Sequence, residues 1–409
     1  MATSSGKAGK RRALIVGGSM SGLLAALLLQ RRGWQVDVFE RVEGELADRG
    51  AGIIAQADLI ETLRRLGIDA TDLGVEITTR KILDASGRLA GEFACPQVLT
   101  AWESVYRLLR DSLAREHYHR GRGVSGFVQT ERSVLAQFGD GGAAEGDLLV
   151  GADGLRSTIR QQCLPQLVPG YVGYVAWRGL IAEAALTPGI HRELFNFMTF
   201  CLPPGEQCVG YPIAGPDSDL RPGRRRYNVV WYRPADESSE LKRLLTDETG
   251  TTHMISIPPP LIRRETIAQM RAAAEQLLAP QFREVVRIIE EPLLQPIYDL
   301  ETPRMAFGRV AIIGDAAFVA RPHVAAGVSK AADDAAAMAA ALDVDEVEPA
   351  LRRFEAQRLP VGRRIIERAR HLGAYLQATQ TPAERARSQR HSIPEAVLAE
   401  TGVLDFLRE

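Results

Sequence analysis

The sequence predicts an α/β protein in which an open parallel sheet is interrupted by a second, mainly antiparallel sheet and is followed by a C-terminal helix. Three observations predict it. Short apolar runs at 13–16, 147–154 and 309–317 contain or run into glycine and acidic residues, a pattern typical of buried parallel strands. Residues 171–275 differ in character, because they concentrate aromatic and β-branched side chains between Pro/Gly loops. A long amphipathic helix pattern begins at Val347.

The first unit of the chain runs from residue 12 to 40. It reads as an apolar strand at 13–16, a glycine turn at 17–22, a helix of small and apolar residues at 23–31 and a second strand at 36–39 that ends on Glu40. This order of strand, turn, helix and strand with a terminal acid is the pattern of a Rossmann-like dinucleotide site.

Each part of that unit has a physical role. Gly17 lets the chain turn off the strand, Gly22 lets the helix approach the sheet, and the helix N-terminus presents N–H groups to a pyrophosphate. Glu40 is placed to accept hydrogen bonds from a ribose diol. Ser19 replaces the middle glycine of the usual fingerprint, and the turn also approximates a hydrolase nucleophile elbow, although Ser21 then stands where that motif requires glycine.

The next stretch predicts a loop, a hairpin and a helix. The loop after Glu40 carries Arg49 and Gly52, and Arg49 either contacts an anion or is solvated. Strands at 75–83 and 89–93 flank an Asp-Ala-Ser-Gly turn, and a helix at 102–116 carries Arg107, for which surface salt bridging is the ordinary explanation.

Two later strands also end in acids. The strand at 147–150 leads into Asp153 and Gly154, with Arg156 and Arg160 beyond them, and an acid in this position lies where open α/β sheets bind ligands, although a plain turn explains it too. The strand at 309–313 leads into Gly314 and Asp315. An alanine-rich helix is predicted from 328 to about 342.

The pattern predicts four segments. They are a first part of the nucleotide-type domain (1–170), an inserted aromatic-rich sheet domain (171–275), a second part of the nucleotide-type domain (276–345), and a C-terminal helical region with a polar tail (346–409). The inserted sheet is a plausible wall for a flat substrate, although aromatic core packing is the commoner use of such residues.

Composition narrows the class of partner. The chain of 409 residues has a formal net charge of -1, which gives no electrostatic case for nucleic acid. Its four cysteines form no C-x-x-C pair, and the basic start lacks a long apolar stretch, so we expect a cytoplasmic protein without a signal peptide or membrane span. His117 and His119 stand two apart, which does not suit a shared metal, and we expect no metal site.

Together, the glycine turn with Glu40, the Gly-Ala-Asp-Gly motif at 151–154 and the Gly-Asp-Ala-Ala motif at 314–317 with Pro322 and Gly327 resemble the single-component FAD-dependent aromatic hydroxylases, the family of para-hydroxybenzoate hydroxylase. The resemblance covers residues 12 to about 376. The motifs at 16–22, 174–179, 211–213 and 321–327 are similar to those of the members that act on hydroxypyridines, which also carry serine in place of the middle glycine.

The resemblance implies a set of FAD contacts. It assigns the glycine turn to the pyrophosphate, Glu40 to the adenosine ribose, and Asp315 to the ribityl chain. It assigns Asp153 with Gly154 to FAD and the nicotinamide cofactor, and the 322–327 loop to the flavin ring, where Ala325 replaces a common glycine. The residues implied to bind the cofactor are Gly17, Gly18, Ser19, Met20, Ser21, Gly22, Glu40, Arg41, Arg49, Gly52, Arg107, Asp153, Gly154, Gly314, Asp315, Pro322, Ala325, Ala326, Gly327 and Val328.

The resemblance also implies a reaction. NADH or NADPH would reduce the FAD, and O2 would form a flavin C4a-hydroperoxide that hydroxylates an electron-rich aromatic ring, a hydroxypyridine first and a phenolic, salicylate-like or polyketide ring as the alternative. Tyr211 and His323 are the candidate catalytic residues, because they fall in motifs that face the ring in this family. A flavin-binding interaction protein and a homodimer remain open alternatives.

Overall fold

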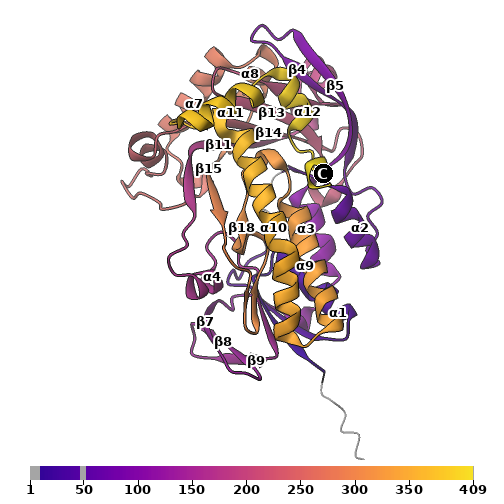
Figure 1. The fold of residues 1–409 in the computed structure, drawn as a ribbon. Coiled ribbons are helices and arrows are strands. Elements are labelled where there is room, and N and C mark those ends of the chain that lie inside the picture. The colour runs from indigo at the N-terminus through magenta and orange to yellow at the C-terminus, as the bar shows by residue number, and fades with distance from the viewer. Residues whose placement is uncertain (1–9, 47–51, 409) are drawn as a thin grey trace, which may run out of the picture.

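The computed structural model describes residues 10–46 and 52–408, and Figure 1 shows them as a parallel-sheet part and a second, larger sheet with a long helix beside both. The first sheet has six strands in the order β16-β17-β10-β1-β2-β6, and all its pairings are parallel except β16 with β17. Its strands are β1 (Arg12–Val16), β2 (Gln35–Phe39), β6 (Tyr118–His119), β10 (Leu148–Gly151), β16 (Ala306–Phe307) and β17 (Val310–Ile312).

Several helices lie beside this sheet, and two of them consist mainly of small and apolar residues. α1 (Met20–Arg31) is buried along most of its length and packs against α9 (Gly327–Val344), whose alanines allow close approach. α3 (Trp102–Asp111) contacts α1, and α2 (Ala57–Arg65) contacts α9. The predicted helix at 102–116 ends early, at Asp111, and a 3₁₀ turn at Arg115–His117 leads into β6.

A small three-stranded sheet lies at the edge of the parallel part. It consists of β7 (Val124–Gln129), β8 (Val134–Phe138) and β9 (Ala143–Gly146), and α4 (Thr158–Cys163) contacts β7.

The second sheet has nine strands in the order β18-β15-β11-β14-β13-β12-β4-β5-β3. Its centre comes from the aromatic-rich segment, whereas both flanks come from elsewhere in the chain. The predicted hairpin at 75–83 and 89–93 forms one flank, and its second strand is longer than predicted because β5 continues to Ala101. The strands are β3 (Gly52–Ile54), β4 (Val75–Leu83), β5 (Leu89–Ala101), β11 (Gly170–Ala182), β12 (Met198–Cys201), β13 (Gln207–Ile213), β14 (Arg226–Pro234), β15 (Leu293–Glu301) and β18 (Phe318–Val319).

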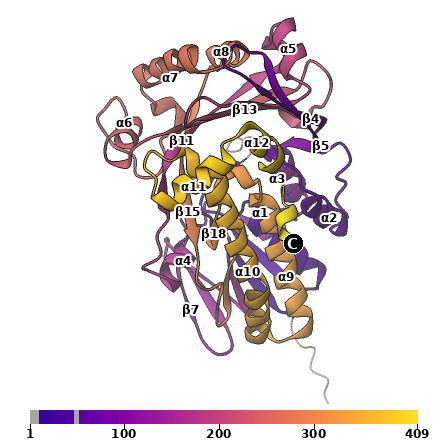
Figure 2. The same cartoon turned by 45° about the horizontal axis from the view of Figure 1, so that its top comes forward.

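The two faces of this sheet have different neighbours. Helices α5 (Pro188–Leu194), α6 (Lys242–Leu244), α7 (Arg264–Leu277) and α8 (Pro280–Arg287) lie on the outer side, as Figure 2 shows, and share a buried apolar cluster with it. The inner face is directed toward the parallel part and carries a separate buried cluster that includes four tyrosines, Tyr174, Tyr211, Tyr232 and Tyr375.

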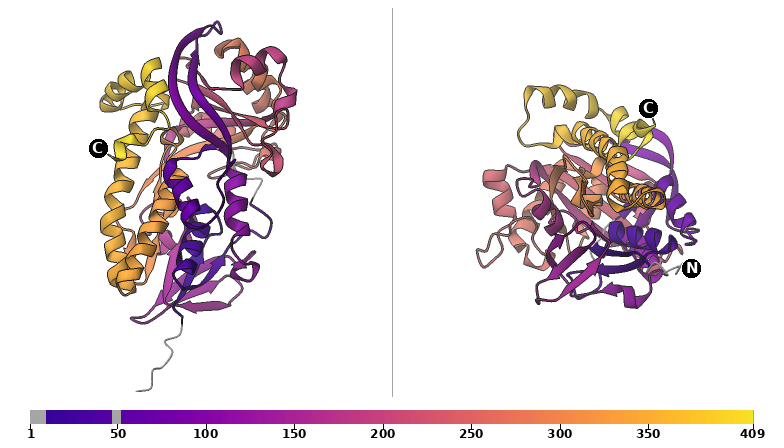
Figure 3. Two further views of the ribbon diagram at one scale, coloured as in Figure 1. Left: turned by 90° about the vertical axis from the view of Figure 1, so that its right-hand side faces the viewer. Right: turned by 60° about the horizontal axis from the view of Figure 1, so that its bottom comes forward.

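The C-terminal region is more ordered than the predicted polar tail. α10 (Val347–Gly373) runs beside both parts, and α11 (Pro382–His391) and α12 (Pro394–Glu400) follow it; the left view of Figure 3 shows this region along one side of the molecule. Thr381 and Glu384 form a capping box at the start of α11, and α12 packs on β5. Within residues 10–46 and 52–408, no helix has the length and apolar composition that crossing a bilayer would require.

Candidate active site

The acids that end the predicted strands meet at one edge of the parallel sheet. β17, β10, β1 and β2 are adjacent and parallel, so their carboxyl ends point the same way. Gly17, Glu40, Asp153 and Asp315 follow these four strands directly or within two or three residues. Ligands of open α/β sheets bind in this position.

The glycine turn packs so closely against neighbouring backbone that two of its positions have no space for a side chain. Gly17 has a φ of +104°, and a Cβ added there would lie 2.4 Å from the Ala152 carbonyl oxygen. A Cβ on Gly22 would lie 1.9 Å from the Gly17 oxygen. Within the described residues, the side chain of Ser19, the N-cap of α1, accepts no hydrogen bond from the first helical turn. The cradle therefore suits a phosphate group at the helix N-terminus.

Glu40 supports this turn from the next strand. Its carboxylate is buried and accepts hydrogen bonds from the backbone N–H of Gly18 at 2.8 Å and of Val42 at 2.9 Å. Each oxygen retains a lone pair for a hydroxyl group of a ligand. Arg41, which follows it, is exposed.

The Asp153 carboxylate accepts its hydrogen bonds from groups of the protein itself. Its carboxylate accepts hydrogen bonds from the Ser157 hydroxyl at 2.5 Å and from the N–H groups of Thr158 at 2.7 Å and Ile159 at 3.3 Å, so it caps α4. Burial raises the pKa of Asp153, and these donors oppose the rise. The neighbouring Arg160 donates to the carbonyl of Ala316 at 3.1 Å, which ties two strand-end turns together.

Asp315 and Lys330 form an asymmetric pair. The Lys330 ammonium lies 3.9 Å from the Asp315 carboxylate, and the Lys330 side chain is 1% exposed whereas that of Asp315 is 56% exposed. One side of the carboxylate thus faces a buried cation while solvent reaches the other, the arrangement needed for a carboxylate that accepts hydrogen bonds from a polyol chain.

The 321–327 loop leads into α9. Ala325 adopts a left-handed conformation with a φ of 50° and ψ of 33°, the conformation that a glycine would adopt without strain. Among the described residues, nothing lies within 4 Å of a Cβ added to Gly327, so open space remains before the α9 N-terminus. The Gly402 N–H donates to the His323 carbonyl at 2.7 Å and fixes the loop from the C-terminal region.

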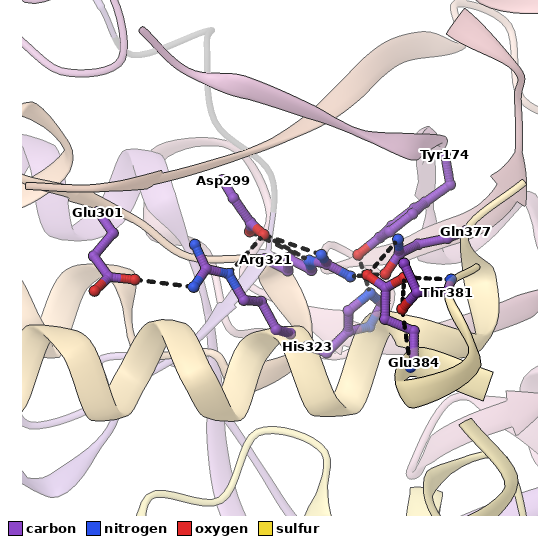
Figure 4. A network of polar contacts seen from close by, with 9 residues as sticks. Tyr174, Asp299, Glu301, Arg321, His323, Gln377, Thr381 and Glu384 are labelled. Atoms are coloured by element: carbon purple, nitrogen blue, oxygen red, sulfur yellow. Dashed lines mark hydrogen bonds and ion pairs between the residues drawn. The ribbon is translucent and has the colours of Figure 1, made fainter. Parts of the chain in front are cut away.

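His323 lies in a buried polar network (Figure 4). Its Nε2 is 3.0 Å from the Tyr174 hydroxyl, and its Nδ1 has no partner within the described residues. Burial, with the charges of Arg321 and Arg178, lowers the pKa of His323 to about 3, so the ring is neutral in neutral solution. Arg321 itself is held by Asp299, at 3.0 Å.

Tyr211 lies on β13 at the inner face of the large sheet. Its hydroxyl donates to the Gly52 carbonyl at 2.9 Å, and burial raises its pKa well above the ordinary range. Tyr211 belongs to the tyrosine cluster of this face, and the His323 ring borders it, with its centroid 4.4 Å from that of Tyr232. Both predicted catalytic residues are therefore on one side of the sheet.

The predicted flavin-contacting arginines have different environments. Arg107 pairs with Glu103 at 2.6 Å and with Asp217 at 2.9 Å, and its side chain is 46% exposed. Arg49 lies outside the described residues. Gly52 lies in β3, where its carbonyl contacts Tyr211.

Two residues with a place in this site were missed by sequence reasoning. Tyr174 is the partner of His323, and Arg178 carries a positive charge on the same face of the sheet. The signal that would have found them is the alternation of β11, because residues 174, 176 and 178 share one face of a strand.

The chain is similar to known proteins along most of its length. The family described as FAD binding domain-like matches residues 171–299. The chain is 32% identical to 2,6-dihydroxypyridine 3-monooxygenase of Paenarthrobacter nicotinovorans over 90% of this chain and 91% of that protein. It is 28% identical to 3-amino-4-hydroxybenzoate 2-monooxygenase of Streptomyces cremeus over 93% and 91% of the two chains. The structure of 2,6-dihydroxypyridine-3-hydroxylase from Arthrobacter nicotinovorans matches with a TM-score of 0.85 at 30% identity, covering 91% of this chain and 94% of that one.

Proposed function

This chain belongs to the family of FAD-dependent aromatic-ring monooxygenases, and from that membership we propose that it hydroxylates a hydroxypyridine ring with NADH or NADPH as electron donor. The observation that carries the choice of ring is the likeness, over nine-tenths of both chains, to a protein named for 2,6-dihydroxypyridine. The tyrosines on the inner face of the large sheet support it, because they give that face flat aromatic surfaces.

FAD supplies the redox and oxygen chemistry when it is bound, and the protein supplies its position. We propose that the Gly17–Gly22 turn and the α1 N-terminus hold the pyrophosphate, that Glu40 accepts from the ribose, and that Asp315 accepts from the ribityl hydroxyls. The α9 N-terminus at Gly327 would stabilise negative charge at the flavin edge, since the positive end of the helix dipole lies there.

Tyr211 and His323 are proposed to orient the substrate. A tyrosine with a raised pKa stays protonated, so Tyr211 acts as a hydrogen-bonding group and not as a base. A histidine whose pKa is about 3 is a weak proton acceptor, so His323 holds Tyr174 and the loop in place more readily than it removes a proton.

The test is turnover by the purified holoenzyme. NAD(P)H oxidation, oxygen uptake and product mass are measured with 2,6-dihydroxypyridine, 4-hydroxybenzoate, salicylate and no ring. We expect 2,6-dihydroxypyridine to accelerate flavin reduction and to gain one oxygen atom from ¹⁸O₂, with little NAD(P)H consumed when no ring is present. Hydroxylation of only the benzoate compounds would move the substrate class to phenolic acids. Bound flavin that no ring makes reducible would indicate a non-catalytic flavin-binding protein.

We also propose a homodimer in the cytoplasm. The four cysteines, Cys95, Cys163, Cys201 and Cys208, are all free, which fits a reducing compartment. Light scattering during size-exclusion chromatography distinguishes dimer from monomer.

A further inference from the structure

Arg178 is a cation on the inner face of the large sheet that has no counter-ion among the described residues. Its Nε donates to the Gln295 side-chain oxygen at 2.7 Å, and no carboxylate oxygen among residues 10–46 and 52–408 lies within 4.0 Å of its guanidinium group. Two arginines of β14 do pair with carboxylates, because Arg226 lies 3.6 Å from Glu103 and Arg233 lies 3.1 Å from Glu206. Arg80 of β4 instead donates to Gln97 and to the Leu398 carbonyl.

The strand register places Arg178 in a row of paired residues that lies between the row of Tyr211 and the row of Tyr232. Arg178 is opposite Val230 on β14, and Val230 is opposite Val209 on β13. In the row on one side, Tyr211 is opposite Asn228; in the row on the other side, Tyr232 is opposite Gln207. Residues opposite one another in antiparallel strands share a face, so Arg178 is on the side of the sheet that carries Tyr211 and Tyr232.

The positive charge of Arg178 changes the pKa values of nearby side chains. It lowers the pKa values of Tyr211 and Tyr232, which the larger effect of burial raises. It also lowers the pKa of His323, in the same direction as burial. A ligand that lies on this face of the sheet meets the positive charge of Arg178.

We propose that Arg178, oriented by Gln295, binds the substrate as its ring oxyanion and is the specificity-determining residue for acidic hydroxylated rings. This inference rests on the proposed function. The ring O–H bond breaks heterolytically, its proton passes to water and the electron pair stays on the ring oxygen facing the guanidinium. The ring thereby becomes electron-rich without a strong protein base, which agrees with the low basicity of His323.

The test compares ligand binding by holoenzymes that differ at this position. Dissociation constants for 2,6-dihydroxypyridine and for 2,6-dimethoxypyridine, which cannot ionise, are measured from flavin absorbance across pH. The variants are Arg178→Gln, Arg178→Lys and Gln295→Ala, and the control is Arg192→Gln, which removes an exposed arginine from α5.

Loss of the charge should weaken binding of the ionised dihydroxypyridine by roughly ten- to one-hundred-fold, the scale of a hydrogen bond to a charged group. Arg178→Lys should restore part of this affinity, Gln295→Ala should lose less, and the dimethoxy compound should bind wild type and Arg178→Gln equally. The substrate ionisation seen in the binding profile should move to higher pH in Arg178→Gln, which a purely structural loss would not cause.

The two hypotheses fail differently. Equal affinities and equal pH profiles in wild type and Arg178→Gln would overturn the role of Arg178 while leaving the proposed function intact. A wild-type enzyme that binds no hydroxylated ring would overturn the proposed function and this inference with it. If Arg178→Gln fails to retain FAD, the Arg178→Lys and Gln295→Ala comparisons decide, and unchanged affinity in both would count against the proposal.

Discussion

The hydroxyl of Tyr174 lies 3.0 Å from Nε2 of His323, and this contact joins the large sheet to the loop that precedes α9. His323 is 3% exposed, and its ring nitrogens have no other hydrogen-bond partner within the described residues. Because this imidazole is buried and neutral, the free energy of unfolding depends on pH.

The first prediction concerns that dependence. His323 has a pKa of about 3 in the folded protein against 6.5 ordinarily, so only the unfolded chain binds a proton between these values. The free energy of unfolding should therefore fall as pH decreases through this window. In His323→Gln, the loss of stability between about pH 7 and about pH 5 should be smaller by about 2 kcal/mol. Urea unfolding at both pH values measures it, and His117→Gln is the control. An unchanged difference would show that His323 is protonated in the fold.

A second prediction concerns the cofactor. Gly22→Val places a branched side chain where even a Cβ would lie 1.9 Å from the Gly17 oxygen, and Glu40→Ala removes the acceptor for the Gly18 N–H. Both variants should purify without FAD or lose it on dilution. Gly44→Ala, at a glycine with open space around it, is the control. Stoichiometric flavin in Gly22→Val would contradict the proposed position of the pyrophosphate.

Ala325 provides a third prediction. Its left-handed conformation costs an alanine about 1 kcal/mol, whereas glycine adopts it freely but loses more entropy on folding. Ala325→Gly should leave the unfolding free energy unchanged or raise it by up to about 1 kcal/mol, and Ala325→Val should lower it by more than about 1 kcal/mol. Ala326→Gly, at a neighbour with a right-handed backbone, should be destabilising. A clear loss of stability in Ala325→Gly would show that the packing of the Ala325 methyl group outweighs the strain.

The fourth prediction tests Tyr211. Tyr211→Phe removes the hydrogen bond to Gly52 and the hydroxyl that we place near the ring. The variant should keep FAD and lower hydroxylation by roughly ten- to one-hundred-fold, the scale of a hydrogen bond to a charged group, with peroxide replacing product. Oxygen uptake with and without catalase separates the two outputs, and Tyr298→Phe, outside the tyrosine cluster, is the control. Normal coupling would remove Tyr211 from the mechanism.

The strand-end motifs were predictable because each consists of an apolar strand followed directly by a turn with glycine or an acid. Gly17, Glu40 and Asp315 could be placed at one edge of a sheet from the order of apolar runs and turns alone, since parallel strands bring their carboxyl ends together. The inserted antiparallel sheet was also predicted correctly from its composition.

The parts that depend on distant partners were not predictable. The register that places Arg178 between Tyr211 and Tyr232 follows from pairings among β11, β14 and β13, which no local pattern encodes. The engagement of Asp153 in capping α4 and the pairing of Arg107 with Asp217 likewise depend on side-chain directions. The C-terminal helices have weak local sequence signals. α12 packs on β5, and this contact with a distant part of the chain is not visible in the local sequence.

The nine-stranded sheet has a consequence for how such proteins diverge. The segment that carries the tyrosines is joined by backbone pairing to β4 on one side and to β15 on the other. A chimaera that received this segment from a relative would have to rebuild both junctions in register before it could fold. New ring preferences should therefore arise by point substitutions on the inner face more readily than by recombination of whole modules, and mutant libraries directed at that face are the better route to altered specificity.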